Sequence, residues 1–316
     1  MSSTKFFGFL WFMTLLAFAA AFGWAELHYI PPEKGPENGD TQNTKKTITV
    51  KAVDELQEPF LGGFLPRIAP DGKTAFDTYA AVAPEAHPSV PRIAIIIQRL
   101  GFKSKEADYA INSLPAEVSL AFSPYAAELS DLGEKAREKG HEVFIQIPME
   151  PLNTNLVDAG TLALTTDLSA DANLTNMKTA MSQMNGYVGV MTSYGSRFTS
   201  QRTMMQPVID EVKKRGLMYI DQRTTNYSHG PNLAREADIP FAFKDVEIDR
   251  ELNAAEISNS LKALEERALR SGLAVGIGSS KMITMRKIEA WAKTLRQKGI
   301  VLVPVSSLAS KQRNIQ

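Results

Sequence analysis

The chain has 316 residues, and its 35 Lys and Arg side chains are balanced by 35 Asp and Glu, for a formal net charge of +0. This balance lacks the basic surface expected of a nucleic-acid-binding protein, so no nucleic-acid partner is predicted. The sequence contains no cysteine, which excludes disulfide bonds, thiolate nucleophiles and cysteine-ligated metals, and its four histidines limit any histidine-based metal site.

An almost unbroken apolar segment lies near the amino terminus, from Phe6 to Trp24. About 20 apolar residues can cross the ~30 Å hydrocarbon core of a bilayer, whereas the apolar region of a cleaved signal peptide has about 7–15. We therefore predict that residues 1–25 form a transmembrane anchor that contacts lipid through residues 6–24. A signal segment that is cleaved is the alternative.

The charges around this segment predict where the rest of the chain lies. Lys5 precedes the apolar residues, and acidic residues follow them. The bias of basic residues towards the cytoplasmic side then favours an exported protein, anchored in the cytoplasmic membrane with its main domain in the periplasm. If the segment is cleaved, the protein is expected to be soluble in the periplasm.

Residues 26–91 are predicted to form a linker, because their first part is rich in proline, glycine and charge and lacks the apolar residues of a core. A short strand is expected over residues 47–53, where β-branched residues are frequent. A short packing segment is expected at about residues 60–82. It carries Phe76 and Tyr79, which we expect to contact the main domain.

From residue 92 onward, strand-like and helix-like segments alternate. The first strand is predicted at residues 92–98, because an unbroken apolar sequence between a proline and a glycine is typical of a strand buried on both faces. Further strands are expected at residues 118–122, 142–147, 186–191, 217–221, 240–243, 273–278 and 300–305. Helices are expected at residues 104–114, 126–139, 170–184, 201–215, 256–271 and 283–298.

Seven or eight such units predict an α/β fold whose parallel sheet is closed, or nearly closed, into a barrel. A flat doubly wound sheet is the structural alternative, which no glycine-rich phosphate loop supports. In both folds, functional side chains are expected where the strands end and loops begin.

Short motifs follow one another in a recognisable order along these strand ends. They are Ile95-Ile96-Ile97-x-x-Leu100-Gly101, Leu120-Ala121-Phe122-Ser123-Pro124-Tyr125-Ala126, Gly140-His141-Glu142-Val143, Ile147-Pro148-Met149-Glu150-Pro151, Gly195-Ser196-Arg197-Phe198-Thr199, Ile220-Asp221-x-Arg223-Thr224 and Val303-Pro304-Val305-Ser306. Together they resemble the divergent polysaccharide deacetylase family, a branch of the glycoside hydrolase/deacetylase barrel superfamily. The resemblance implies a deformed (β/α)7-8 barrel over residues 92–311, preceded by the transmembrane or signal helix and the linker.

For active members of the family, the resemblance also implies metal-assisted removal of an acetyl group from an amino sugar. This sequence departs from the family at the positions that would hold the metal. Where active relatives have an Asp-Asp pair, this chain has Gln98 and Arg99, and where they have histidines it has Gln146, Ser193 and Ser279. An amide is not an anionic ligand, and a guanidinium is neither ligand nor base. We therefore expect no metal and no other cofactor.

Arg99 places a positive charge where the resemblance implies a metal, and two interpretations follow. Its guanidinium forms a bidentate pair with a remaining carboxylate, Asp221 or Glu150, or it extends to solvent from the barrel mouth. Two histidines have other expected roles: His141 is expected to pack or cap at the opposite end of the barrel, and His229 to be solvated in its loop. Asp245 and Asp249 suit a cation site or, as we prefer, a turn and a cap.

The remaining polar residues at the strand ends predict a binding surface. Arg and Tyr suit contacts with carboxylate, phosphate or sugar hydroxyl groups. The candidates are Tyr194, Ser196, Arg197, Asp221, Arg223 and Thr224. The alternative is that Arg197, Arg223 and Asp221 form an internal salt-bridge network that only shapes the loops.

These observations predict a catalytically inactive, deacetylase-like envelope protein with a role in carbohydrate metabolism. Its expected partner is an envelope glycan or a membrane-associated protein. Two alternatives stay open: an active carbohydrate deacetylase or hydrolase with Asp221 as its base, and a structural partner in an envelope complex. An open, polar barrel mouth favours ligand binding, whereas a mouth filled by residues 60–82 favours a scaffold.

Overall fold

The computed structural model describes residues 48–309. The predicted membrane or signal segment, residues 1–25, lies outside the described residues, as does the first part of the linker. Within residues 48–309, no helix combines the length and the apolar character needed to cross a membrane.

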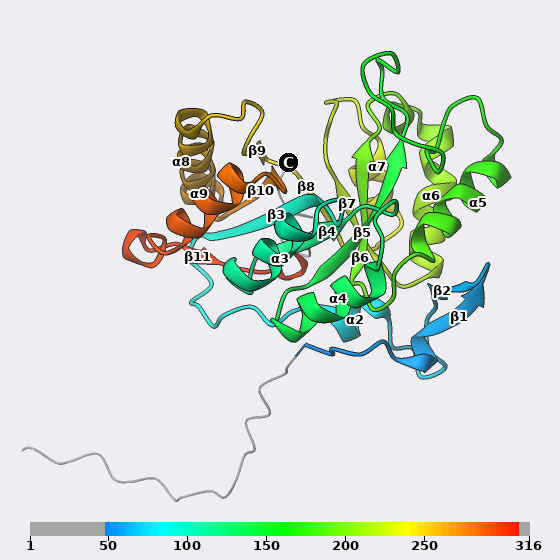
Figure 1. Cartoon of the computed structure of the whole chain (residues 1–316), viewed down its shortest axis with the longest axis horizontal. Helices are drawn as coiled ribbons and strands as arrows, with labels where there is room; N and C mark the ends of the chain where they lie inside the picture. The colour runs from blue at the N-terminus through cyan, green and yellow to red at the C-terminus, as the bar shows by residue number, and fades with distance from the viewer. Residues whose placement is uncertain (1–47, 310–316) are drawn as a thin grey trace, which may run out of the picture. The chain divides into compact units, whose positions relative to one another are not determined.

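A parallel β-sheet forms the centre of the described part (Figure 1). Its strands are β3 (Arg92–Leu100), β4 (Ser119–Phe122), β5 (Val143–Met149), β6 (Gly189–Tyr194), β7 (Met218–Asp221), β8 (Phe241–Phe243), β9 (Val246–Glu247), β10 (Leu273–Ser279) and β11 (Val301–Leu302). The strand order is β8-β7-β6-β5-β4-β3-β10-β9, and β11 pairs with the start of β3.

One short chain segment belongs to both ends of this sheet. β8 pairs with β7 at one end, and β9 pairs with β10 at the other. Only Lys244 and Asp245 separate the two strands, so residues 241–247 reach from one end of the sheet to the other. The sheet is therefore curved into a deformed barrel, and the prediction of a parallel α/β barrel fold is confirmed in this form.

The central strand β3 shows why the sequence adopts this fold. Residues 93–97 are fully buried, because the sheet has neighbours on both of its faces. Such a strand needs apolar side chains at every position instead of alternate ones. Gly101 then takes a φ of 103°, which ends the strand in a conformation that favours glycine.

Helices cover the outside of the sheet (Figure 1). They are α3 (Ser104–Ser113), α4 (Leu129–Glu138), α5 (Ala170–Met181), α6 (Arg202–Lys214), α7 (Gly230–Glu236), α8 (Ala254–Ser271) and α9 (Met282–Ala292). All six predicted helices are present, five of them shorter than predicted and α8 two residues longer, whereas α7 and β9 were not predicted. α7 is short and opens with Gly-Pro, and β9 has two residues, so neither gives a periodic pattern in the sequence.

The segment before the barrel contains a short 3-10 helix (Asp54–Leu56), a hairpin of β1 (Gln57–Phe60) and β2 (Gly63–Pro66), and α2 (Ala75–Tyr79). The predicted strand at residues 47–53 was wrong, since residues 48–53 form none. Side chains take the hydrogen bonds that a neighbouring strand would supply. Arg137 Nε donates to the carbonyl of Val50 at 2.6 Å, and the amide of Val53 donates to Tyr79 Oη at 2.8 Å.

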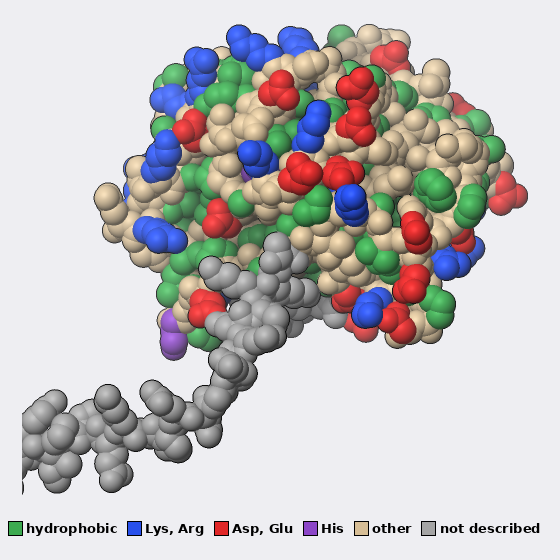
Figure 2. All heavy atoms as spheres, turned by 60° about the horizontal axis from the view of Figure 1, so that its bottom comes forward, with side chains coloured by type: hydrophobic (Ala, Val, Ile, Leu, Met, Phe, Trp, Pro, Cys, Tyr) green, Lys and Arg blue, Asp and Glu red, His purple; other side chains and the backbone are tan. Residues whose placement is uncertain are grey.

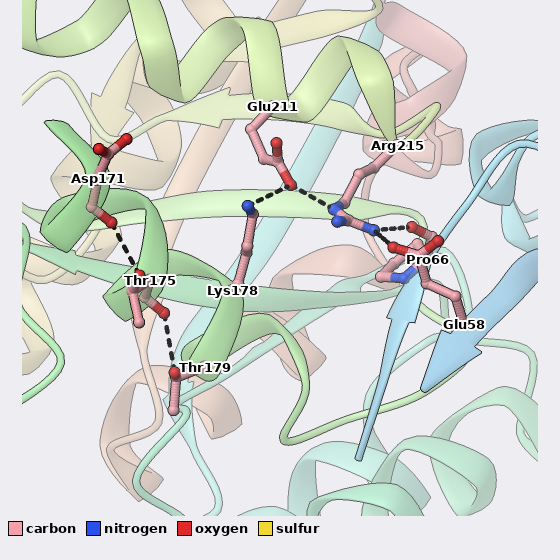
Figure 3. Close-up of polar contacts among 8 residues, drawn as sticks. All are labelled: Glu58, Pro66, Asp171, Thr175, Lys178, Thr179, Glu211 and Arg215. Carbon is pink, nitrogen blue, oxygen red and sulfur yellow. Dashed lines mark hydrogen bonds and ion pairs between the residues drawn. The ribbon is translucent and has the colours of Figure 1, made fainter. Parts of the chain in front are cut away.

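Arg215 attaches the hairpin to the barrel (Figure 3). It lies buried after α6 and donates to Glu211 Oε1 at 2.6 Å, to Glu58 Oε1 at 3.0 Å and to the carbonyl of Pro66 at 2.6 Å. Lys178 on α5 approaches the same Glu211 oxygen at 3.8 Å. One guanidinium therefore joins α6 to both hairpin strands, and the lysine adds α5.

Replacing Arg215 by Met should lower the free energy of unfolding by about 3 kcal/mol, because Glu211 and the carbonyl of Pro66 lose buried partners. Urea unfolding of the variant measures the effect. Arg202→Met is the matched control, since Arg202 also lies on α6 but pairs with Glu236 at the surface, and should cost less than about 1 kcal/mol. Equal losses in the two variants would contradict the proposed role of Arg215.

Glu142 connects three distant parts of the chain inside the protein. Its buried carboxylate accepts hydrogen bonds from Ser119 Oγ at 2.7 Å, the amide of Ser306 at 3.1 Å and the amide of Ala81 at 3.4 Å. These donors come from the start of β4, from the 3-10 helix Val305–Leu308 and from the segment before the barrel. Burial raises the pKa of Glu142.

We expect Glu142→Ala to lower the free energy of unfolding by about 2–4 kcal/mol, since two buried donors and one half-buried donor lose their acceptor. Glu138→Ala, which truncates an exposed side chain of α4, should change it by less than about 0.5 kcal/mol.

The same residue should make the stability depend on pH. A raised folded-state pKa means that protonation of Glu142 favours the folded state, so this contribution is lost as the pH rises from 4.5 through the raised pKa. Glu142→Gln should lack that loss. Identical pH profiles of unfolding for the wild type and Glu142→Gln would contradict the assignment.

The segment before the barrel packs at the amino ends of the strands. Arg137 binds the carbonyls of Asn185 and Gly186 just before β6, and Arg215 lies just before β7. Figure 2 brings the bottom of Figure 1 forward and shows acidic, basic and apolar side chains interspersed there. The carboxyl ends of the strands lie at the opposite end of the barrel, where residues 60–82 do not cover them.

Candidate functional site

The backbone is strained at three of the strand ends. Arg99, Tyr194 and Arg223, at or just after the ends of β3, β6 and β7, have φ values of 59°, 58° and 45°. Residues other than glycine rarely adopt this backbone conformation, which costs on the order of 1–3 kcal/mol for each residue. Such strain collects at binding and catalytic sites, so the barrel mouth is the candidate site.

A layer of glutamines closes the centre of the mouth. Gln98, Gln146 and Gln222 come from β3, from β5 and from directly after β7, and alternate strands of a barrel contribute side chains to one layer. Gln98 Oε1 accepts a hydrogen bond from Gln222 Nε2. Three strands separate β3 from β7 in the sheet, so this bond crosses the barrel.

Gln146, on β5, is almost fully buried. Its Oε1 accepts from the amide of Arg99 at 2.7 Å, which fixes the orientation of the side-chain amide. Its Nε2 is buried and has no hydrogen-bond partner among the residues that the structure describes. The layer therefore keeps one donor unused next to the mouth.

A polar pocket of about 340 Å³ opens at the Gln98–Gln222 bridge; we call it the mouth pocket. Its lining residues are Gln98, Gln222, Arg223, Thr224, Asn226, Lys244, Asp245, Glu247 and Arg250. Lys244 pairs with Glu247 at 3.2 Å, and the Arg223 guanidinium lies 4.8 Å from the centre of the Phe243 ring. The wall thus offers amide, hydroxyl and guanidinium groups to a ligand.

Arg99 does not pair with Asp221 or Glu150. Its side chain is exposed, and no carboxylate within residues 48–309 lies at ion-pair distance from its guanidinium. The positive φ of Arg99 turns the chain at the end of the strand. The pairing hypothesis is therefore wrong, and the solvent-exposed interpretation describes the residue.

Asp221 is buried at the end of β7, with 1% of its surface exposed. Its oxygens accept from Tyr219 Oη at 2.8 Å, Ser228 Oγ at 2.7 Å and the amide of Arg223 at 2.6 Å. Burial, together with the Asp221 charge, raises the pKa of Tyr219 well above its usual value. Because Arg223 and Ser228 stand near the two ends of the loop at residues 222–229, Asp221 fixes this loop.

Glu150 plays the same part after β5. Its buried carboxylate accepts from the amide and the hydroxyl of Thr166, both at 2.7 Å, and Arg197 Nη1 approaches it at 3.4 Å. The amide of Leu152 donates to Ser196 Oγ at 2.9 Å. The loop at residues 151–166 is therefore held near both ends.

The predicted salt-bridge network of Arg197, Arg223 and Asp221 is absent from the described part. Arg197 pairs with Glu150, and Arg223 reaches Asp221 only through its backbone amide. Thr224 Oγ1 donates to the carbonyl of Tyr194 at 2.9 Å, which joins the loop after β7 to the end of β6.

Two further predicted positions lie near the ends of β6 and β10. Ser193 is buried near the end of β6, opposite Pro148 of β5. Ser279 ends β10, and both its amide and its hydroxyl donate to Asp249, which also accepts from Thr284 Oγ1 at 2.7 Å. Asp249 therefore anchors this strand end instead of facing a ligand.

Asp245 also has a structural role. It accepts from the amide of Val275 at 2.9 Å and lies 3.5 Å from Arg267 Nε, while burial raises its pKa. His141 lies at the other end of the barrel, buried between the carbonyls of Val118 and Ile111 at 2.7 and 3.2 Å. Burial lowers its pKa.

The residues at the mouth do not fit a divalent metal. A catalytic zinc needs about three histidine or carboxylate ligands around an open position. Within residues 48–309, no three His, Cys, Asp or Glu side chains are grouped so that they could hold an ion. The positions that the resemblance assigned to ligands carry two glutamines, an arginine and two serines instead.

A family model described as divergent polysaccharide deacetylase matches residues 95–309. The chain belongs to this family. An uncharacterised protein of Agrobacterium tumefaciens C58 has a crystal structure that is 32% identical, with a TM-score of 0.75 over 78% of this chain and 99% of that chain.

Relatives of this chain include an uncharacterised protein of Haemophilus influenzae, which is 25% identical over 71% of this chain and 79% of that protein. Another is the uncharacterised protein YibQ of Escherichia coli K12, 26% identical over 70% of this chain and 68% of that protein. A putative cellobiose-phosphate cleavage protein of Enterococcus faecalis V583 is 12% identical over 70% of this chain and 99% of that chain, with a TM-score of 0.52, which shows a shared fold alone.

Two residues of the mouth pocket, Gln222 and Asn226, were not predicted. Gln222 occupies the variable position of the motif Ile220-Asp221-x-Arg223-Thr224, so the family resemblance gave it no role. Alternation along the strand also argued against it, because neighbouring residues of an extended chain point in opposite directions and Asp221 was expected to face the mouth. Asn226 lies in a loop, where the sequence lacks the regular spacing of apolar residues that marks a helix or a strand.

Asp221→Asn should loosen the loop at residues 222–229. The asparagine places an NH2 group against donors that now share a carboxylate, so we expect a loss of about 1–2 kcal/mol in stability. Hydrogen exchange measured by mass spectrometry should show faster exchange in this loop. Asp210→Asn on the exposed face of α6 is the control, and unchanged loop exchange in Asp221→Asn would contradict the anchoring role.

Proposed function

We propose that this protein is a non-catalytic member of its family that binds a glycan at the mouth of its barrel. The observation that carries the proposal is the state of the two buried carboxylates, Glu150 and Asp221. Each lies at or just after the end of a barrel strand, and each already accepts hydrogen bonds from loop residues.

A hydrolytic function for Asp221 conflicts with its contacts. A general base must accept a proton from water or substrate within hydrogen-bond reach. Both Asp221 oxygens already accept from Tyr219, Ser228 and Arg223, and the side chain has almost no exposed surface. Catalysis by this residue would first require the loop at residues 222–229 to be released.

The groups that line the mouth pocket suit recognition of a polyhydroxylated ligand. Gln98, Gln222, Thr224 and Asn226 offer both donors and acceptors, and Arg223 adds a planar cation. The family is described by its relation to polysaccharide, which supports a glycan over other polar ligands. Residues 60–82 leave the mouth uncovered, which supports ligand binding over a scaffold.

The proposal includes a place in the cell envelope. The apolar segment from Phe6 to Trp24 is long enough to anchor the chain in a membrane, or it is removed as a signal segment. An exported barrel would then meet envelope glycans directly, and the linker would let it reach them. A membrane-associated protein partner is the alternative ligand.

Co-sedimentation of the full-length chain with insoluble chitin and with peptidoglycan sacculi tests the proposal. We expect binding without acetate release, and Gln222→Ala should weaken binding at least ~10-fold, or about 1.4 kcal/mol. Gln183→Ala, on the exposed surface after α5, should bind as the wild type does. Acetate release that Asp221→Asn abolishes, or no binding to either polysaccharide, would refute the proposal.

A further inference from the structure

A second pocket lies beside the mouth pocket, with a volume of about 550 Å³; we call it the side pocket. Leu152 and Ser196 come to it from the loops after β5 and β6, and Tyr227 and His229 from the loop after β7. Asn226 lines both this pocket and the mouth pocket. The two hollows therefore adjoin at Asn226.

The side pocket combines an apolar wall with polar groups. Tyr227 is 79% exposed and Leu152 is 68% exposed, although both are large side chains. Ser196, Ser228, His229 and Asn232 supply hydroxyl, imidazole and amide groups around them. An amphipathic aromatic ring beside a few directional polar groups is the arrangement of a small-ligand site.

The loops that carry this wall are fixed before any ligand arrives. Asp221 binds Arg223 and Ser228 on either side of Tyr227, and the amide of Leu152 donates to Ser196 Oγ. The amide of His229 donates to the carbonyl of Thr199 at 2.9 Å. A wall held in place in this way loses little conformational freedom on binding, which favours affinity.

We infer that the side pocket is a second subsite, and that the ligand is a linear oligosaccharide that occupies both pockets. One sugar ring lies in the mouth pocket, and the apolar face of the next ring stacks on Tyr227, with Asn226 between them. This inference rests on the proposed glycan binding. It adds that recognition depends on chain length, and it gives the buried carboxylate of Asp221 a positioning role for Tyr227.

Calorimetric titration of the full-length chain with two series of sugars tests the inference. The probes are β-1,4-linked N-acetylglucosamine from monomer to tetramer, and the disaccharide and tetrasaccharide of the peptidoglycan glycan strand. For at least one series, we expect affinity to rise ~10-fold or more on lengthening, or about 1.4 kcal/mol. Tyr227→Ala should remove this gain and leave the affinity for the shortest bound sugar unchanged.

Two controls separate stacking from general effects. Tyr227→Phe should keep the rise in affinity with chain length, because the ring face remains. Leu269→Ala is the second control, since it removes an exposed apolar side chain from α8, away from both pockets. Equal affinity for short and long sugars, or an equal loss for both in Tyr227→Ala, would overturn the second subsite and leave glycan binding intact. If no member of either series binds, the proposed function fails with it.

Discussion

The site depends on a buried negative charge that neutral groups stabilise. No basic side chain within the described part of the chain lies within ion-pair distance of Asp221. Removing a carboxylate from water is costly unless hydrogen bonds replace the lost hydration, so its three donors must stay in place. Those donors come from β7 and from the loop after it. The position of that loop is therefore fixed by the need to solvate one charge.

Acidic side chains hold backbone segments elsewhere in the barrel too. Glu150 holds the loop after β5, Asp249 holds the end of β10, and Glu142 joins the carboxyl-terminal 3-10 helix to the segment before the barrel. In each case an acidic side chain near a strand end accepts from backbone amides and hydroxyls. These four carboxylates therefore serve as internal anchors, while the mouth pocket offers amides, hydroxyls and cations, with Glu247 paired to Lys244 in its wall.

The fold was predictable because its main strands and helices have clear hydrophobic patterns in the sequence. The apolar residues 93–97 and the amphipathic helices around them specify a parallel sheet covered on its outer face. The segment before the barrel was less predictable. Its β-branched residues favoured a strand at residues 47–53, but Arg137 and Tyr79, distant in sequence, bind the backbone there.

The site was predictable in position and less so in its contacts. Strand ends in the sequence identified Gln98, Gln146 and Asp221 as residues of the mouth. The direction of Arg99 was not predictable, because it follows from a positive φ that no sequence pattern encodes. The bridge from Gln98 to Gln222 was also hidden, since it depends on the curvature that brings β3 opposite β7.

The segment at residues 241–247 has one further consequence. It completes the circumference of the barrel, and its two central residues, Lys244 and Asp245, also stand in the wall of the mouth pocket. A change in the number of residues here would alter the girth of the barrel and the width of the pocket together, and with them the span that the Gln98–Gln222 bond has to cross. The number of residues in the segment 241–247 can therefore adapt such a barrel to thinner or broader ligands.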